Sequence, residues 1–364
     1  MITNERNIEG KTMERISLQT GKSRIECITK ALEGYFENQK IDEGKEIAIL
    51  PNMIPAQGRN MTGVSQFDAI KSVADFFTGK YDNINIVTAV PSEHIQYAEE
   101  ILGSANPDIK IINPGDEDIL TKFGVNQFEV FDKEGNLMPL EISAIPEKMP
   151  LVVLCVPKTH DRAAFTGNVK NQMGLITGKK GNMHNGYALN KLSDTLCNYN
   201  LTKLHEYMSK YEPLYVCDSY EAMEGNGPYG ANMRQLMFGM VSKDAVALDS
   251  IALLLMNLVN HDGQILNPSD FAYLFMLNRM NHQCRIRYGT LFLSIDELFE
   301  YENLNANISK EELKDTIKKI GTLAAHRDIK DQYEASRAII DAVGEDETKI
   351  DNPAEIIRRV AATI

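Results

Sequence analysis

The sequence lacks a long apolar run and has no surplus of positive charge. None of its apolar stretches approaches the roughly 20 residues that a membrane-spanning helix needs, and the opening MITNERNIEG is too polar for a secretory signal. The formal net charge of the 364 residues is -13, whereas nucleic acids and anionic membranes require an extended positive surface. We therefore predict a cytoplasmic protein with neither nucleic acid nor membrane as a partner.

Closely spaced cysteines and internal repeats are also missing. The five cysteines are odd in number and widely spaced, and no two of them form a C-x-x-C pair. This pattern indicates reduced thiols rather than a disulfide framework. Cys155 and Cys217 each lie in an apolar run typical of a buried strand, where cysteine behaves as a small hydrophobic residue. The absence of repeats excludes solenoid architectures.

Strand and helix patterns alternate along most of the chain. Apolar residues at helical spacing predict a first helix within residues 22–39, and short apolar runs predict strands. The predicted strands are 45–50, 83–90, 109–112, 151–156, 213–218 and 235–241, and further helices are predicted at 65–77 and 92–102. Such alternation predicts an α/β fold, a mostly parallel sheet with helices on both faces.

Two segments depart from this alternation. Between residues 123 and 145 a turn, DKEGN, separates short extended pieces and predicts a small β insertion. The last predicted strand runs into an apolar helix with Ser242 as its predicted N-cap, and beyond residue 290 the chain is charged and helix-prone, with a capping-box pattern from Ser309 to Glu312. The predicted organisation is a flexible tail (1–16), an α/β region (17–150), a second α/β region (151–290) and a helical C-terminal appendage (291–364).

Positive charge is concentrated in the segment from residue 156 to residue 191. The segment holds one acid, Asp161, against Lys158, Arg162, Lys170, Lys179, Lys180 and Lys191, together with His160 and His184. It follows a predicted strand, and ligands of open α/β sheets bind outside the carboxyl ends of the strands. We interpret the segment as a site for an anion.

Lys158 and His160 stand two residues apart in the motif PKTH. If the chain stays extended, both side chains project from the same face and could hold a carboxylate or phosphate, or combine a cation with an acid/base group. The alternative is a solvated loop. The glycines and lysines that follow would allow close approach to an oxyanion, but their spacing matches neither a P-loop nor a dinucleotide fingerprint, so nucleotide binding is not predicted.

Carboxylates supply a second set of candidates. In DSYEAMEGNGPYG, Asp218 and Glu224 follow a predicted strand, where they could bind a hard cation or act as bases, unless the segment is simply a tight turn with solvated acids. Asp249 lies within an apolar helix, so it needs a partner such as a backbone N–H or a lysine, or has a shifted pKa. A divalent metal held by Asp218, Glu224 and Asp249 is one hypothesis.

Three ordered blocks of the sequence resemble the signature of a known family. VPKTHDRAAFTGNVKNQMGLITGKKGNMH, AMEGNGPYG and VSKDAVALDSIALLLM are similar to the blocks of the family called domain of unknown function 362, and the similarity extends from about Lys45 to His261. The residues that the resemblance marks are Lys158, His160, Thr166, Gly167, Lys170, Asn171, Gly174, His184, Glu224, Gly225, Asn226, Gly227, Pro228, Asp244 and Asp249.

The chain differs from this family in two respects. Family members are often joined to ferredoxin-like modules, whereas this chain lacks the clustered cysteines of such modules, so no iron–sulfur cluster of its own is expected. Leu50 stands where the family often has lysine, which indicates a different ligand.

The leading hypothesis is an enzyme that acts on a small anionic metabolite, a carboxylate or a phosphate. The predicted catalytic residues are Lys158, His160 and His184, and the predicted substrate-binding residues are Arg162, Thr166, Lys170, Asn171, Lys179 and Asn226. The reaction could be redox, with an external electron-transfer protein, or proton transfer next to a carboxylate. The alternatives are a binding or delivery protein for a metal, cofactor or metabolite, and an interaction protein that uses the C-terminal helices. The sequence leaves the cofactor and the oligomeric state open.

Overall fold

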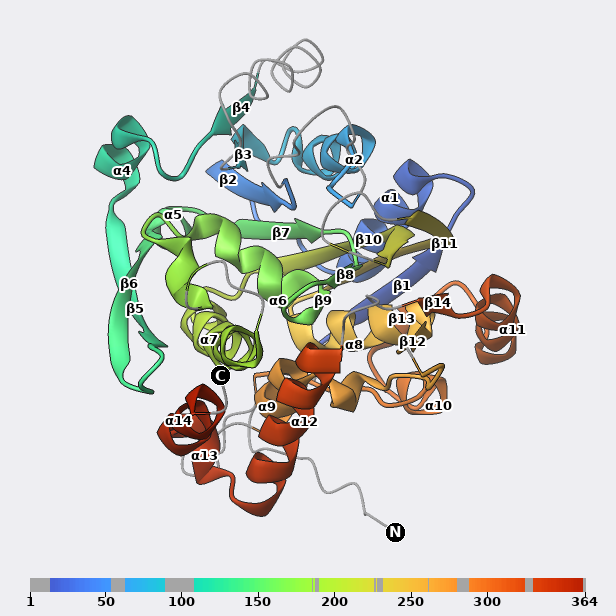
Figure 1. Cartoon of the computed structure of the whole chain (residues 1–364). Coiled ribbons are helices and arrows are strands. Elements are labelled where there is room, and N and C mark those ends of the chain that lie inside the picture. Colours follow the sequence, from blue (N-terminus) through green and yellow to red (C-terminus); the bar gives the residue numbers. More distant parts are fainter. Residues whose placement is uncertain are drawn as a thin grey trace.

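A twisted, mostly parallel sheet forms the centre of the molecule (Figure 1). The computed structural model describes residues 14–53, 63–88, 108–184, 186, 190–225, 227, 232–260, 262–279, 288–324 and 330–362. The strands run in the order β13 (Leu304–Ala306), β1 (Ile16–Thr20), β11 (Asn232–Ser242), β10 (Leu214–Glu224), β7 (Leu151–Cys155), β2 (Gly44–Pro51), β3 (Tyr81–Val87) and β4 (Ile109–Ile112). Strands β10, β7, β2, β3 and β4 are parallel, while β11 is antiparallel to both of its neighbours.

Helices cover both faces of the sheet (Figure 1). On one face lie α1 (Arg24–Phe36) and α2 (Phe67–Phe77); on the other lie α6 (Asn168–Asn171), α7 (Lys191–Ser209) and α8 (Ala245–Met256). The alternation of side chains in β2 shows how one strand serves two cores. Ile47 and Ile49 enter the core under α1 and α2, whereas Ala48 and Leu50 enter the larger core on the opposite face. The predicted fold class is confirmed.

Further elements surround the central sheet and the helices that cover it. The predicted β insertion is the hairpin of β5 (Val125–Phe131) and β6 (Leu137–Ser143), which packs on α7. The outer helices α9 (Ala272–Arg279), α12 (Lys330–Glu345) and α14 (Ala354–Ala361) form another layer on α7. The short elements are α4 (Glu117–Phe123), α5 (Ile145–Lys148), α10 (Ile295–Phe299), α11 (Lys310–Ile320), α13 (Thr348–Asp351), β8 (Lys158–His160), β9 (Ala164–Thr166), β12 (Leu258–Val259) and β14 (Leu323–Ala324). No helix in the described part of the chain is both long and apolar enough to cross a membrane.

Several local predictions need adjustment. Strand β1 begins at Ile16, within the range predicted as a tail, and β13 of the C-terminal region joins the central sheet. Asp244, not Ser242, caps α8: the Asp244 side chain accepts from the Ala247 N–H, while the Ser242 hydroxyl accepts from the Asp244 N–H. The capping box of Ser309 is confirmed, and the predicted helix 92–102 lies outside the described residues.

The connectivity reverses direction between β2 and β7. From β2 the chain proceeds outward through β3 to β4, and it then returns to place β7 on the other side of β2. The loops that leave the carboxyl ends of β2 and β7 therefore turn to opposite faces of the sheet. In open α/β sheets ligands usually bind between such loops, and we call this position the crevice.

Candidate functional site

Lys158 lies at this reversal. The chain continues extended past Pro157, so that Lys158 begins the short strand β8, which pairs with β9 and with the end of β10. The Lys158 side chain is fully buried, and its Nζ donates to Asn52 Oδ1 (3.1 Å), just beyond β2, and to the Gly63 carbonyl (2.6 Å). Lys158 thus joins the two sides of the crevice.

The surroundings of Lys158 favour its neutral form. Burial, followed by repulsion from Lys170, lowers the pKa of Lys158 to about 7. No carboxylate of the described residues offsets this effect. The group therefore exchanges a proton near neutral pH, which an ordinary lysine does not.

Lys170 acts electrostatically on several other basic side chains. Its charge lowers the pKa of Lys158, His160 and His184, so all three side chains lie around it. Burial lowers the pKa of Lys170 itself, and its Nζ has no hydrogen-bond or ion-pair partner among the described residues. We call Lys158, His160, Arg162, Lys170 and His184 the cationic cluster; Lys170 acts electrostatically on both predicted histidines.

Both histidines are neutral at physiological pH. Burial and Lys170 lower the pKa of His160 to about 3, although Asp161 acts in the opposite direction. The His160 Nδ1 lies 3.0 Å from the Arg162 backbone nitrogen and 2.9 Å from Asp161 Oδ1, so a donor and an acceptor both reach this nitrogen. Burial lowers the pKa of His184 to about 4, with Arg162 as the next cause, and the His184 Nδ1 contacts the Gly186 carbonyl. In the free protein these rings are hydrogen-bonding groups rather than proton carriers.

Asp249 holds the loop that carries Lys170. Its Oδ1 accepts from the Asn168 N–H (2.6 Å) and its Oδ2 from the Val169 N–H (3.1 Å), so that it caps the first turn of α6. Gly167 makes this approach possible, since a Cβ there would lie 2.2 Å from Asp249 Oδ1. Burial raises the pKa of Asp249 to about 7 despite these bonds. Its partners are the backbone N–H groups foreseen as the alternative to a metal.

The predicted substrate-binding residues divide into separate groups. Asn171 Nδ2 donates to the Leu50 and Leu154 carbonyls at 3.1 and 3.0 Å, so this amide links β2 and β7. Thr166 is buried beside the cluster in β9, and its hydroxyl has no hydrogen-bond partner among the described residues. Lys179 lines a different groove, and Asn226 lies outside the described residues.

The three carboxylates proposed as metal ligands are engaged elsewhere. Asp218 Oδ2 accepts from Arg24 Nε (2.9 Å), Glu224 Oε1 accepts from Arg234 Nε (2.8 Å), and Asp249 caps α6. Within the described residues no three His, Cys, Asp or Glu side chains form a group that could hold a metal ion. The structure therefore does not assemble the predicted metal set.

Residues 122–253 match the family model described as Domain of unknown function (DUF362). That part of the chain is similar to the DUF362 family. No match was found among curated proteins. The matched range is shorter than the resemblance from Lys45 to His261, and it holds the whole cationic cluster and Asp249.

Residues outside the DUF362 match complete the site. Asn52 and Gly63, the acceptors of Lys158, precede the matched range. Leu50, where the family often has lysine, is buried against Gly174, at which a Cβ would lie 2.9 Å from Leu50 Cδ1. This wall of the crevice is therefore apolar and contributes no cation.

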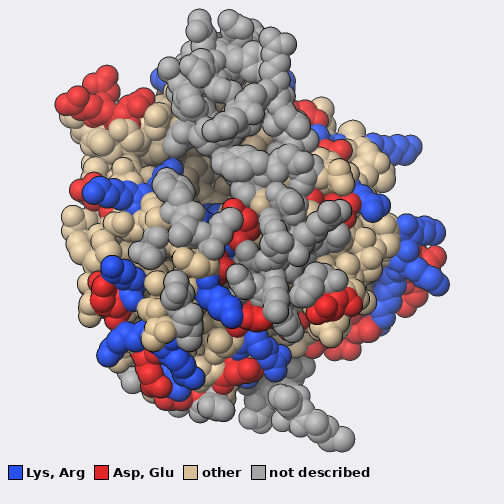
Figure 2. Space-filling model, in the orientation of Figure 1, with Lys and Arg blue, Asp and Glu red and all other residues tan. Residues whose placement is uncertain are grey.

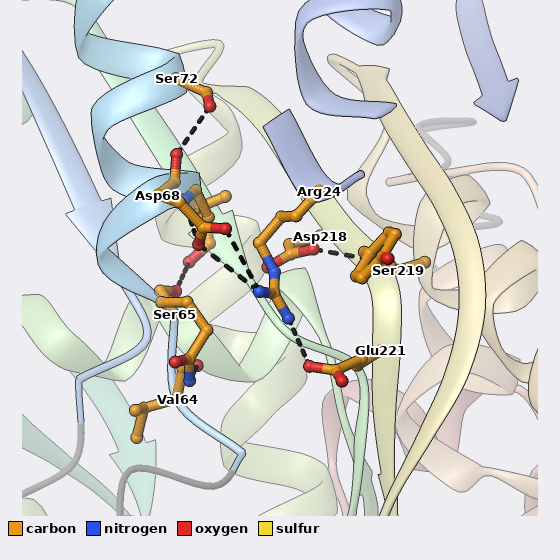
Figure 3. Close-up of polar contacts among 12 residues, drawn as sticks. Arg24, Val64, Ser65, Asp68, Ser72, Asp218, Ser219 and Glu221 are labelled. Carbon is orange, nitrogen blue, oxygen red and sulfur yellow. Dashed lines mark hydrogen bonds and ion pairs between the residues drawn. The ribbon is translucent and has the colours of Figure 1, made fainter. Parts of the chain in front are cut away.

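Sequence reasoning missed a second charged cluster beside the DUF362 residues. Arg24, at the start of α1, contacts Asp68 of α2 and both Asp218 and Glu221 of β10 (Figure 3). We call these four residues the Arg24 cluster. A cation in the first turn of a helix opposes the helix dipole, and this was the available signal that carboxylates lie nearby. Burial raises the pKa of Asp218 to about 7, although Arg24 acts in the opposite direction.

A cavity lies at the opposite edge of the central sheet, at the amino ends of the parallel strands. It measures about 670 Å³ and is lined by residues near the amino ends of the strands, among them Tyr81, Pro150 and Leu214. We place the functional site at the carboxyl edge instead, because strand-to-helix loops converge there and the cations of the DUF362 match lie there. On the molecular face in Figure 2, described acidic and basic side chains are interspersed.

Proposed function

We propose that the protein is an enzyme that acts on a small anionic metabolite, a carboxylate or a phosphate, bound at the crevice between β2 and β7. The observation that carries this proposal is the cationic cluster itself. The charge of Lys170 lowers the pKa of Lys158, Arg162 lowers that of Lys170, and Asp161 is the one carboxylate of the described residues that acts on Lys170. Cations that repel one another in a water-poor site favour a ligand anion.

Lys158 is the preferred acid/base group in this proposal. A general acid or base works best when its pKa is near the operating pH, which favours Lys158 at about 7 over His160 at about 3 and His184 at about 4. As a neutral amine, Lys158 can give its two hydrogens to Asn52 Oδ1 and the Gly63 carbonyl and keep its lone pair for a substrate proton. The reaction class that this supports is proton transfer at a carbon next to the anionic group.

The first test measures anion binding. Calorimetric titration with phosphate, sulfate and small carboxylates should show binding that Lys170→Met weakens about tenfold, the effect of losing roughly 1.4 kcal/mol of attraction. Lys318→Met is the matched control, since Lys318 is exposed on α11, and should change affinity less than twofold. Equal affinity in wild type and Lys170→Met would contradict an anion site at the cluster.

The second test separates an enzyme from a delivery protein. Deuterium incorporation from D2O into 2-hydroxy and 2-amino acids, followed by NMR, should occur with the wild type and be lost in Lys158→Met. Lys158→Met should still bind anions through Lys170, more weakly. Anion binding without exchange or turnover of any bound acid would favour the alternative, a non-catalytic binding or delivery protein.

A further inference from the structure

A groove separate from the cationic cluster lies at the carboxyl end of β4. It measures about 600 Å³ and runs between the loop that follows β4 and the glycine-rich segment before His184. Its lining residues are Asn113, Pro114, Gly115, Ile176, Thr177, Gly178, Lys179, Lys180, Gly181, Asn182 and Gly186. The volume falls in the range of small-molecule sites and exceeds what a lone inorganic anion fills.

The polar groups of this groove suit an anion. None of its described lining residues is acidic, although the chain carries a net charge of -13. Burial lowers the pKa of Lys180, and neither Lys179 nor Lys180 has a hydrogen-bond or ion-pair partner among the described residues. The hydroxyl of Thr177 is buried and has no hydrogen-bond partner in the part of the chain that the structure describes.

The groove and the cationic cluster share one continuous edge. Gly186 lines the groove, and two residues earlier His184 belongs to the cluster, so the same short segment contributes to both. The carboxyl ends of β7 and β4 are three strand positions apart in the sheet, which corresponds to ~14 Å. A single extended ligand can therefore reach both.

We propose that the groove is a second anion subsite, which binds a phosphoryl group of the metabolite whose reacting end lies at the cationic cluster. This inference rests on the proposed function and specifies the substrate class: an elongated metabolite with two anionic groups separated by on the order of 10–14 Å, a spacing set by the strand positions. Lys179, Lys180 and the Thr177 hydroxyl supply the cations and the donor for the phosphoryl oxygens.

The test uses synthetic probes of two lengths. Calorimetry at pH 7 compares 3-phosphonopropionate, which reaches one subsite, with 11-phosphonoundecanoate, which can span both; undecanoate controls for the alkyl chain. The long probe should bind at least tenfold more tightly than either of the others. The double variant Lys179→Met/Lys180→Met should remove this advantage and leave the affinity for 3-phosphonopropionate within twofold, and Lys318→Met should alter neither.

The outcomes distinguish this inference from the proposed function. If the double variant leaves the affinity for the long probe unchanged, the groove is not a subsite and the inference is overturned. If Lys170→Met changes the affinity for neither probe while the double variant still lowers the affinity for 11-phosphonoundecanoate, the groove is an anion site. The cationic cluster is then not the reacting site, and the proposed function is contradicted. Equal weakening of short and long probes by the double variant would also overturn the two-subsite arrangement.

Discussion

Two charged clusters lie on either side of the same strand ends, and they treat charge in opposite ways. In the Arg24 cluster one guanidinium meets three carboxylates, each within ion-pair distance. In the cationic cluster, Lys170 has no ion-pair partner among the described residues and depresses the pKa of its neighbours. The first cluster pairs its one cation within the protein and carries a surplus of carboxylates, whereas in the second Lys170 has no carboxylate within ion-pair distance among the described residues.

This difference separates a structural role from a binding role. An ion pair that joins α1, α2 and β10 fixes three elements, and its removal leaves a charge without compensation. A buried cation without an opposite charge nearby lowers the stability of the ligand-free protein, and binding of an anion restores that stability. Mutations in the two clusters should therefore act on different measured quantities, stability in one and affinity in the other.

The largest effect is expected from Arg24→Met. Asp218 is 1 % exposed, and without Arg24 it has no cation to pair with. We expect a loss of about 3–5 kcal/mol in the free energy of unfolding at pH 8, measured by urea denaturation. Because the folded-state pKa of Asp218 is already raised, its contribution is stabilising at acid pH and is lost as pH rises through about 7. The destabilisation should accordingly shrink at pH 5.

Arg15→Met is the control for this experiment. Arg15 pairs with Glu37, whose side chain is 59 % exposed, so its loss should cost less than about 1 kcal/mol. If Arg24→Met lowers the free energy of unfolding at pH 8 no more than Arg15→Met does, Arg24 does not stabilise the buried carboxylates of the Arg24 cluster. Sulfate affinity, measured on the folded protein, should stay within twofold of wild type in both variants. A large loss of sulfate affinity in Arg24→Met would show that the two clusters act as one site.

A smaller effect is expected from Asp249→Asn, which tests how the protein positions Lys170. The amide offers one acceptor oxygen in place of two, so either the Asn168 or the Val169 N–H loses its partner at the start of α6. We expect a stability loss of about 2 kcal/mol by urea denaturation, and a few-fold loss in sulfate affinity as the loop of Lys170 loosens.

Ser250→Ala provides a matched comparison within α8. The Ser250 hydroxyl donates to Ala247 O and accepts from the Phe292 N–H, away from α6. This variant should lower stability by about 1 kcal/mol without changing sulfate affinity. If Asp249→Asn lowers stability and leaves affinity unchanged, Asp249 supports only the fold and does not position the anion site.

The sequence predicted the parallel sheet, the hairpin insertion and the concentration of cations, because these depend on local periodicity and composition. The sequence does not reveal which residues form contacts when they lie far apart along the chain. Nothing around Arg24 specifies that Asp218, far along the chain, is its partner, and nothing around Asp249 specifies the N–H groups of α6. The role of Lys158 also depends on burial, which changes its pKa, and burial is a property of the packed structure.

The smallest expected effect is the pH dependence of sulfate affinity. Sulfate keeps its charge between pH 6 and 8, while Lys158, with a pKa of about 7, loses its proton. A bound anion favours the charged lysine, so binding takes up a proton and affinity should fall roughly five- to tenfold from pH 6 to pH 8. His160 and His184, with pKa values of about 3 and 4, do not titrate in this range.

In the control variant Lys158→Met, sulfate affinity should be nearly constant between pH 6 and 8. Asp249 also has a pKa of about 7 and becomes negative over the same range, so a slope that persists in Lys158→Met would assign the titration to Asp249 and remove Lys158 as the acid/base group.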